Sequence, residues 1–353
     1  MRSLFSTSID EALVDVPMVL VVGPSWVGDM VMAQSLFRVL KQRDPELGIQ
    51  VLAPSWARPL LERMPEVEAA IPLPIGHGKL ALKQRKEIAR RLKLRRFNRS
   101  IVLPNSWKSA LIPYFAEIPL RTGWLGEYRY WLLNDIRYRP KKLPMMVQRF
   151  IALGIPAGES PPERIPIPRL DIQTFQVEKT LRRLGLNKNP HRPMLALCPG
   201  AEYGPAKQWP VESFGEVARA HHEQGWLVWL FGSRRDKEIC TAVNTNSGNI
   251  CLDLSGRTGL EQAIDLLSLA TSVVSNDSGL MHIAAAIGRP VVGLFGSSDP
   301  AHTPPLSNRA RILSLNLKCS PCFKRECPLG HLNCLKQISV QQVLDALTDI
   351  CGE

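Results

Sequence analysis

Long apolar runs are missing from this chain of 353 residues. It contains no stretch of about 18 consecutive apolar residues, which a helix needs in order to span a bilayer. The first seventeen residues carry Asp10, Glu11 and Asp15 where a secretory signal would be apolar. We therefore predict a cytoplasmic protein without a transmembrane segment, in which residues 1–17 form an N-terminal extension.

The chain also lacks the glycine pattern of dinucleotide-binding proteins. That pattern, Gly-x-Gly-x-x-Gly, joins a strand to a helix, and an acidic residue follows at the end of the next strand. The first loop of this kind here carries Gly23 and Gly28, which are spaced differently, and no acid stands clearly at the end of the next strand. These absences argue against a dehydrogenase.

The composition is that of a folded protein with an anionic partner. Hydrophobic residues make up 45% of the chain and charged residues 22%, which is ordinary for a globular protein. Because 353 residues exceed what one core accommodates, we expect two domains with a cleft between them. The formal net charge of +12 predicts a nucleic acid, an anionic membrane or a phosphorylated substrate as partner.

Two series of alternating strands and helices follow one another. Residues 18–23 form a short apolar, β-branched run, residues 29–42 have helical spacing, and residues 48–53 form another apolar run. A second series opens at residue 193, after a region dense in proline. Further strands are predicted at 67–73, 100–103, 194–198, 226–231, 273–275 and 290–295, with a helix at 79–96.

This alternation predicts an α/β fold of two doubly wound, Rossmann-like domains that face each other across a cleft. The first domain is predicted to span residues 18–160 and the second residues 193–353. Residues 161–192 are predicted to link them.

Asp29 lies in the loop between the first predicted strand and its helix. Free N–H groups and the positive end of the helix dipole gather in such a loop, so an acidic residue there needs an explanation. Asp29 could simply cap the helix. It could instead act as a general base that takes a proton from an acceptor hydroxyl in the cleft.

Three loops at strand ends of the second half carry small or polar residues. Such strand ends converge on one crevice, and the free N–H groups there suit a nucleotide diphosphate. The alternatives are a solvated surface position for Lys207, a helix cap for Asp277 and a packed helical position for His282. The candidate binding residues are Gly200, Glu202, Tyr203, Lys207, Gly232, Asp277, Ser278, Gly279 and His282.

Three segments together resemble the ADP-heptose:lipopolysaccharide heptosyltransferases. They are the loop from Gly23 to Asp29, the segment Lys207-Gln-Trp-Pro210 and the segment Asp277-Ser-Gly-Leu-Met-His282, and the similarity extends over residues 18 to about 345. The resemblance implies a B-type glycosyltransferase fold. It also implies transfer of L-glycero-D-manno-heptose from ADP-heptose to the first heptose of the lipopolysaccharide inner core, with inversion at the anomeric carbon.

The same resemblance implies roles for individual residues. Asp29 matches the catalytic base, and Lys207 matches the lysine that neutralises the departing diphosphate. The segment that holds the heptose and the phosphates of the donor is matched by Asp277, Ser278, Gly279 and His282.

The chain departs at two places from the pattern of heptosyltransferase I, one type within this family. Glu202 and Tyr203 precede the lysine where two hydroxyl residues stand in that pattern. Asp236 lies at an unfamiliar offset, so the acid that would bind the nucleoside is left unassigned.

No Asp-x-Asp motif is present to hold a divalent ion against a diphosphate. Lys207, helix N-termini and loop N–H groups would then stabilise the charge, so we predict no catalytic metal and no required cofactor, with ADP-heptose as the donor. Two alternatives stay open: an enzyme of the same fold that uses another sugar nucleotide, and a non-catalytic protein that binds a nucleotide sugar or an anionic lipid. Asp29 argues against the second, because binding alone has little use for a base.

Positive charge is concentrated between residues 79 and 96, where nine basic residues face one acid, Glu87. Apolar residues at helical spacing predict that one face of this helix is buried, through Leu80, Leu82, Ile88, Leu92 and Leu94.

The charged face of this helix is interpreted as a docking surface. Its predicted partners are a phosphorylated lipopolysaccharide precursor and the anionic cytosolic face of the inner membrane, with a merely solvated face as the alternative. A nucleic acid is not expected, because Phe97 is the only aromatic residue in the segment and no binding module is recognised. The predicted docking residues are Lys83, Arg85, Lys86, Arg90 and Arg91.

Four of the eight cysteines, Cys319, Cys322, Cys327 and Cys334, fall within sixteen residues, with His331 among them. The Cys-x-x-Cys start suits zinc, but the later spacings are not those of a familiar zinc ribbon. Because the resemblance implies no metal, we predict reduced thiols or a local disulfide, with a structural zinc as the alternative.

Overall fold

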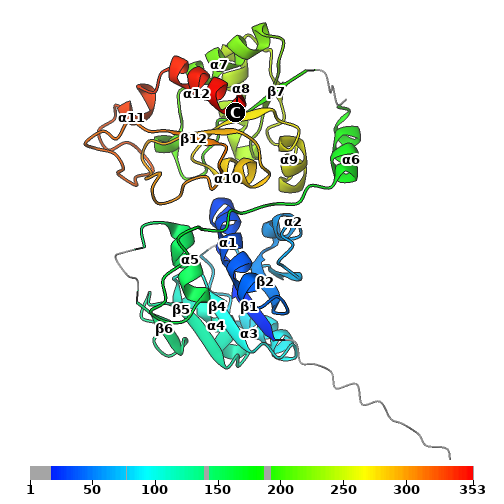
Figure 1. Cartoon of the computed structure of the whole chain (residues 1–353), viewed down its shortest axis with the longest axis vertical. Helices are drawn as coiled ribbons and strands as arrows, with labels where there is room; N and C mark the ends of the chain where they lie inside the picture. The colour runs from blue at the N-terminus through cyan, green and yellow to red at the C-terminus, as the bar shows by residue number, and fades with distance from the viewer. Residues whose placement is uncertain (1–16, 77, 139–142, 187–191, 353) are drawn as a thin grey trace, which may run out of the picture.

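The computed structural model describes residues 17–76, 78–138, 143–186 and 192–352. These residues form two α/β halves stacked one above the other, each built on its own sheet (Figure 1). The first sheet ends with β6 (Asp135–Arg137) and the second begins with β7 (Met194–Cys198). Of the predicted N-terminal extension, only residue 17 belongs to the described part.

The first sheet has six parallel strands in the order β3-β2-β1-β4-β5-β6. The chain enters at the centre, winds outward to β3 and then continues on the other side of β1. Because the direction of winding reverses between β1 and β4, the loops after these two strands diverge and leave a crevice at the carboxyl edge. The strands are β1 (Met18–Val22), β2 (Gly48–Pro54), β3 (Ala69–Leu73), β4 (Arg99–Val102), β5 (Leu120–Trp124) and β6.

The second sheet repeats this winding, in the order β12-β11-β10-β7-β8-β9, and its strands are also parallel. Its crevice therefore lies after β7 and β10. The strands are β7, β8 (Leu227–Leu230), β9 (Leu252–Asp253), β10 (Ser272–Asn276), β11 (Val291–Leu294) and β12 (Ala310–Leu313).

Helices cover both faces of each sheet. They are α1 (Val27–Arg43), α2 (Arg58–Leu61), α3 (Leu82–Lys93), α4 (Trp107–Phe115), α5 (Met146–Gly154), α6 (Thr174–Leu184), α7 (Val211–Glu223), α8 (Lys237–Asn246), α9 (Leu260–Leu267), α10 (Gly279–Ala286), α11 (Asn333–Lys336) and α12 (Val340–Gly352). Short 3₁₀ turns are η1 (Ser55–Ala57), η2 (Pro205–Lys207) and η3 (Arg234–Asp236).

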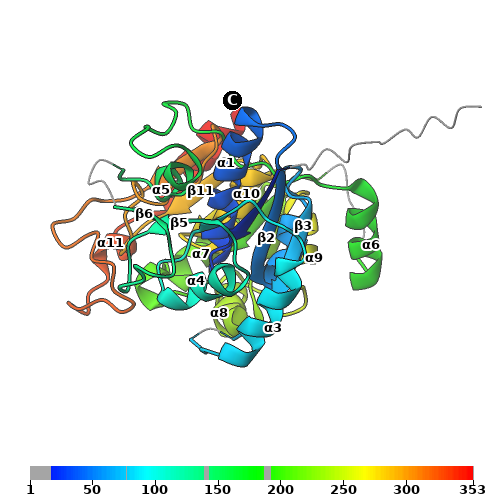
Figure 2. The same cartoon turned by 90° about the horizontal axis from the view of Figure 1, so that it is seen from below.

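The alternation of side chains along β1 gives the first half two cores. Val19 and Val21 pack with α1 and α5, whereas Leu20 and Val22 pack with α3 and α4 on the opposite face. Figure 2 shows these helix pairs on opposite sides of the sheet. A strand buried on both faces reads as a continuous apolar run, which is why the sequence predicted this strand well.

The buried face predicted for the basic helix is wrong in part. Leu80 and Leu82 are 41% and 42% exposed, and Leu94 is 84% exposed. The helix is shorter than predicted, Leu82–Lys93, and it buries Arg85, Ala89 and Leu92 instead. The basic residues outnumber the leucines around the whole helix, so the apolar spacing alone did not identify the inward face.

Two helices that the sequence did not predict, α5 and α6, lie within the proline-rich region and just after it. α5 packs against α1 in the first half, and α6 packs against α9 in the second half. Between them, the segment around Arg169 is held by α1, since the Gln34 side-chain amide pairs with both the N–H and the carbonyl of Arg169 at 2.8 and 2.6 Å. The next residue, Leu170, donates its N–H to the Ala286 carbonyl at 3.0 Å, which ties the linker to α10.

An ion pair also joins the two halves directly. Arg63, just after α2, donates to the Asp265 carboxylate of α9 at 2.6 Å, and both side chains are almost completely buried. Thr180 of α6 donates to the other oxygen of Asp265 at 3.0 Å. The buried carboxylate is thus held from both sides, which fixes how α2, α6 and α9 meet.

Candidate active site

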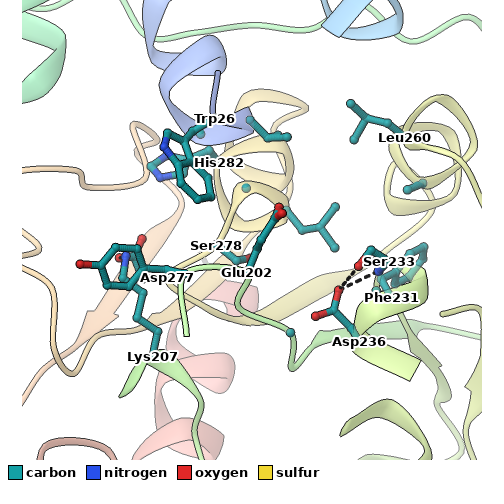
Figure 3. Close-up of a pocket in the computed structure, with 18 of the residues that line it drawn as sticks. Trp26, Glu202, Lys207, Phe231, Ser233, Asp236, Leu260, Asp277, Ser278 and His282 are labelled. Atoms are coloured by element: carbon teal, nitrogen blue, oxygen red, sulfur yellow. Dashed lines mark hydrogen bonds and ion pairs between the residues drawn. The ribbon is translucent and has the colours of Figure 1, made fainter. Parts of the chain in front are cut away.

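A cavity of about 410 Å³ lies between the two halves, where the N-termini of α1 and α10 meet. The first half lines it with Trp26 to Asp29 and Met32, and the second half with loops that follow β7, β8 and β10 (Figure 3). Both sheets therefore present their carboxyl edges to one cavity, as expected for doubly wound domains. Asp29 and every residue predicted to bind the nucleotide sugar line this cavity.

Neither Asp29 nor Asp277 is the N-cap of the helix beside it. α1 has Trp26 as its N-cap, and Asp29 is the third helical residue. α10 has Ser278 as its N-cap, and Asp277 precedes it. Neither cap side chain accepts a hydrogen bond from the first turn of its helix, so the first N–H groups of both helices stay uncapped at the cavity. The capping alternatives for Asp29 and Asp277 are therefore wrong.

Two glycines allow the helix ends to approach each other. A Cβ atom at Gly28 of α1 would lie 2.6 Å from Cδ2 of His282 in α10. A Cβ atom at Gly279 of α10 would lie 2.6 Å from Cβ of Val27 in α1. Both distances are too short for real atoms, so a side chain at either position would force the two halves apart at the cavity.

Asp29 is the carboxylate without a partner. Among the described residues, no hydrogen bond or ion pair reaches it. Burial, reinforced by the negative charge of Asp277, raises the pKa of Asp29 to about 6, although Lys207 acts in the opposite direction. Such a group is mainly ionised at neutral pH and still basic enough to accept a proton.

Lys207 and Asp277 form an ion pair across two loops of the second half. Asp277 also accepts a hydrogen bond from the Ser298 hydroxyl at 2.5 Å. The Lys207 ammonium lies 5.0 Å from the centre of the Tyr203 ring, a cation–π contact that further restricts it. These contacts hold a positive charge in a fixed place at the cavity wall.

His282 lies on α10 with only 5% of its surface exposed. Burial lowers its pKa to about 4, against the attraction of Asp277 and with the help of Lys207. The imidazole is therefore neutral at neutral pH, so one ring nitrogen donates and the other accepts. The packed position was one of the two predicted alternatives, and in this structure the packed residue also lines the cavity.

Asp236 fits between two glycines. A Cβ atom at Gly200 would lie 2.4 Å from the Asp236 carboxyl group, and one at Gly232 would lie 2.8 Å from the Asp236 Cβ. Its carboxylate accepts hydrogen bonds from the N–H and the hydroxyl of Ser233 at 2.8 and 2.7 Å (Figure 3). The sequence left Asp236 without a role, and the structure puts it in the cavity wall.

Glu202 stands at an exposed part of the cavity wall. Arg235 donates to its carboxylate at 2.7 Å, which links the loop after β7 to the loop after β8. Neighbouring Tyr203 donates its hydroxyl to the Phe323 carbonyl at 2.7 Å. Both residues therefore line the cavity while being held by other loops.

Sequence reasoning missed several apolar or small residues of the cavity, because nothing in their local pattern marks them as functional. Phe231 follows directly on β8, and its burial there was readable as part of a strand. Trp26 is 43% exposed at the first turn of α1, an unusual place for so large an apolar side chain. The missed residues include Trp26, Met32, Phe231, Thr258, Leu260 and Ala263.

The predicted docking residues lie away from the cavity, on α3. Lys83, Lys86, Arg90 and Arg91 are exposed. Arg85 is different: it is 6% exposed, and its guanidinium donates to backbone carbonyls, including that of Lys108 at 3.0 Å. Arg85 thus ties α3 to α4 and cannot belong to a docking surface.

The four clustered cysteines surround a second, much smaller cavity of about 20 Å³. All eight cysteines are free thiols. Within the described residues, no three His, Cys, Asp or Glu side chains are placed so that they could hold a metal ion as they stand. The same described part of the chain has no helix that is both long and apolar enough to cross a membrane.

The comparisons with known proteins agree on one family. The model for glycosyltransferase family 9 (heptosyltransferase) matches residues 85–333. Lipopolysaccharide heptosyltransferase 2 of Escherichia coli is 46% identical over 339 residues, which cover 93% of this chain and 97% of that protein. Lipooligosaccharide heptosyltransferase 2 of Haemophilus ducreyi is 47% identical over 308 residues, 84% of this chain and 88% of that protein.

The solved structure of ADP-heptose lps heptosyltransferase II from E. coli superposes with a TM-score of 0.82 at 44% identity, over 95% of this chain and 98% of that one. This similarity confirms the predicted B-type glycosyltransferase fold, with two parallel six-stranded sheets that face one cavity. Since both the family model and these relatives cover most of the chain, the protein belongs to glycosyltransferase family 9, the heptosyltransferases.

Proposed function

We propose that this protein transfers L-glycero-D-manno-heptose from ADP-heptose to the first heptose of the lipopolysaccharide inner core, with inversion at the anomeric carbon. Family membership and the heptosyltransferase 2 relatives support the reaction class and the substrates. The observation that carries the chemistry is the pair of opposed charges in the cavity. An unpartnered carboxylate, Asp29, projects from the first half, and a fixed ammonium, Lys207, projects from the second.

Asp29 is the proposed general base. In an inverting displacement, the acceptor oxygen forms a bond to the anomeric carbon while the bond from that carbon to the phosphate oxygen of ADP breaks. The proton of the acceptor hydroxyl passes to the Asp29 carboxylate. Because burial raises the pKa of Asp29 to about 6, the carboxylate is a stronger base than an exposed aspartate and is still mostly ionised at neutral pH.

Lys207 and the N-terminus of α10 are proposed to stabilise the leaving diphosphate. Lys207 provides a full positive charge, and the open N–H groups that follow Ser278 provide hydrogen-bond donors. Asp277 holds Lys207 in place, so the ammonium need not reorganise when charge develops on the departing phosphate. This arrangement requires neither a catalytic metal nor a cofactor at the diphosphate, so adding Mg²⁺ to the chelated protein is expected to leave its kcat unchanged.

The nucleoside of the donor is proposed to bind between Phe231 and α9. Phe231, Leu260 and Ala263 form an apolar part of the cavity wall that suits an adenine ring. Asp236 lies close by and still has acceptor capacity for the ribose hydroxyls. This assignment gives Asp236 the role that sequence reasoning left open.

The exposed face of α3 is proposed to bring the enzyme to its acceptor at the cytosolic face of the inner membrane. Lys83, Lys86, Arg90 and Arg91 offer positive charge to anionic headgroups and to a phosphorylated lipopolysaccharide precursor. Cosedimentation with vesicles that contain anionic lipid should occur at low salt and weaken as salt rises. No binding to anionic vesicles under those conditions would remove this part of the proposal.

The test of the function is release of ADP from ADP-heptose in the presence of a core acceptor that carries one heptose. The proposal predicts release that depends on the acceptor and a product extended by one heptose of inverted configuration. Release only with a different sugar nucleotide would identify another enzyme of this fold. Tight ADP-heptose binding without turnover on a competent acceptor would identify a non-catalytic binding protein.

A further inference from the structure

The second cavity of the protein is built from thiols. It lies outside the active-site cleft and has a volume of about 20 Å³, enough for one water molecule or one ion. Cys319, Cys322, Cys327 and Cys334 all line it, together with His331. A segment of sixteen residues, from Cys319 to Cys334, thus brings every cysteine of the cluster to one small space.

A buried hydroxyl at the same cavity lacks a partner. Ser297 is 1% exposed, and its Oγ atom makes no hydrogen bond among the described residues. Ser297 lines the thiol cavity. Because a buried polar atom without a partner costs stability, this orphan hydroxyl indicates that the cavity receives a polar or charged occupant.

The chain makes a tight turn directly after Cys327. Gly330 adopts a positive φ of 70°, and its N–H donates to the Cys327 carbonyl at 3.1 Å. The turn brings Cys327 and His331 to the same cavity.

We propose that Cys319, Cys322, Cys327 and Cys334 together bind one Zn²⁺ ion as a structural site. Four soft thiolates with a Cys-x-x-Cys start are the ligand set that zinc prefers for closed, four-coordinate sites. Four S–Zn bonds form, and the protons of those thiols that are not yet ionised are released to solvent.

Among the described residues, the side chains of these cysteines do not stand in ligating positions. The backbone already brings all four residues to one cavity, so rotation of the cysteine side chains about χ1 is the movement that binding requires. Cys334 is the least accessible of the four ligands, with 8% of its surface exposed.

The proposed ion would stabilise the loop that supports Lys207. Residues 323–325 lie between Cys322 and Cys327 and contact the active-site loop directly. Tyr203 donates its hydroxyl to the Phe323 carbonyl at 2.7 Å, and Ala206 donates its N–H to the Arg325 carbonyl at 3.0 Å. A closed metal site would therefore fix the backbone that positions the catalytic ammonium.

The first test measures metal directly. The full-length protein, purified without chelator and in reducing buffer, should contain about one zinc ion per chain by elemental analysis. A mercurial that titrates thiols should release this ion. Zinc far below one per chain after reconstitution with Zn²⁺, a disulfide within the cluster, or iron in place of zinc would overturn the proposal.

The second test uses matched cysteine variants. The double substitution Cys319→Ser and Cys322→Ser removes two ligands at exposed or half-exposed positions, so the protein should still fold. It should lose the zinc, whereas Cys351→Ser, an exposed cysteine outside the cluster, should keep it. Zinc retained by the double variant, or lost equally from the control, would contradict the assignment.

The third test distinguishes an effect of zinc on the active-site loop from an effect of zinc on the folding of the whole protein. Loss of zinc should raise the KM for the sugar nucleotide about tenfold while the circular dichroism of the sheets is unchanged. Readdition of Zn²⁺ to chelated wild-type protein should restore the KM, but it should not restore the double variant. Because zinc content is measured independently of activity, failure of the proposed transfer reaction would leave this test intact.

Discussion

The two sides of the active-site cavity hold their charges in different ways. On the first half, the Asp29 carboxylate has no partner among the described residues, and burial raises its pKa to about 6. On the second half, Lys207 is paired with Asp277, which in turn accepts a hydrogen bond from Ser298. One side keeps a group free to exchange a proton, and the other keeps a charge fixed.

This difference matches the two tasks of an inverting transfer. A base must change its protonation state during the reaction, so strong pairing would weaken it. A group that stabilises a leaving diphosphate works best when its position is set beforehand. The contrast predicts distinct consequences when either side is altered.

The largest expected effect follows from Asp29→Asn. The amide keeps the size of the side chain but cannot accept the proton, so kcat should fall about 10³-fold. Calorimetry with ADP-heptose should show donor binding close to that of the wild type, since the proposed donor site is formed mainly by the second half. A kcat within a few-fold of wild type would show that Asp29 is not the base.

Lys207→Met should act on the donor side. Removal of the ammonium should lower kcat/KM about 10²-fold and weaken ADP binding, because charge on the diphosphate is no longer neutralised. Lys207→Arg is the matched control that keeps the charge and should recover part of the loss. Equal binding of ADP by wild type and Lys207→Met would mean that the ammonium does not contact the diphosphate.

Gly28→Ala should disturb the place where the two sides meet. A Cβ atom there would lie 2.6 Å from His282, so α1 must shift, and a displacement of Asp29 by even a fraction of an ångström should reduce kcat about tenfold. Gly76→Ala, where a Cβ atom meets nothing closer than 3.7 Å, is the control and should leave kcat unchanged. Unchanged kcat in both variants would contradict the close approach of the two helices.

The smallest expected effect is on stability. The folded-state pKa of Asp29 lies above its unfolded value of 3.8, so the folded protein binds the proton more tightly and loses stability as pH rises from about 4 to about 6. Asp29→Asn removes this cost and should stabilise the protein at pH 7 by up to about 3 kcal/mol in chemical unfolding. At pH 3 the two proteins should be nearly equal, and a destabilised variant at pH 7 would contradict the raised pKa.

The sequence predicted the strands and loops that form the cavity better than it predicted the side chains that line it. Strands buried on both faces, such as β1 and β7, stand out as apolar runs, and their loops placed Asp29, Lys207 and Asp277 at one crevice. The apolar cavity residues Trp26 and Leu260 were missed, because a residue that contacts a ligand has the same local pattern as one that packs in a core.

Two other features that the sequence did not predict have physical explanations. Arg85 was predicted to be exposed because its neighbours are basic, yet its guanidinium is buried and donates to backbone carbonyls of Leu80 and of Lys108 in α4. Local charge density does not reveal which side of a helix packs. Asp236 has room in the cavity wall because Gly200 and Gly232 have no side chains. These two glycines follow different strands and come close to Asp236 only in the folded chain.

The most direct test of this account is the pH dependence of kcat/KM for the wild type and for Asp277→Asn. The wild type should lose activity as pH falls, with a midpoint of about 6, as Asp29 becomes protonated. Because Asp277 raises the pKa of Asp29, its removal should move this midpoint to lower pH, whatever its effect on the maximal rate. A wild-type midpoint near 4, or one that does not move in Asp277→Asn, would contradict the central claim that Asp29 is the base and is tuned by the opposite side of the cavity.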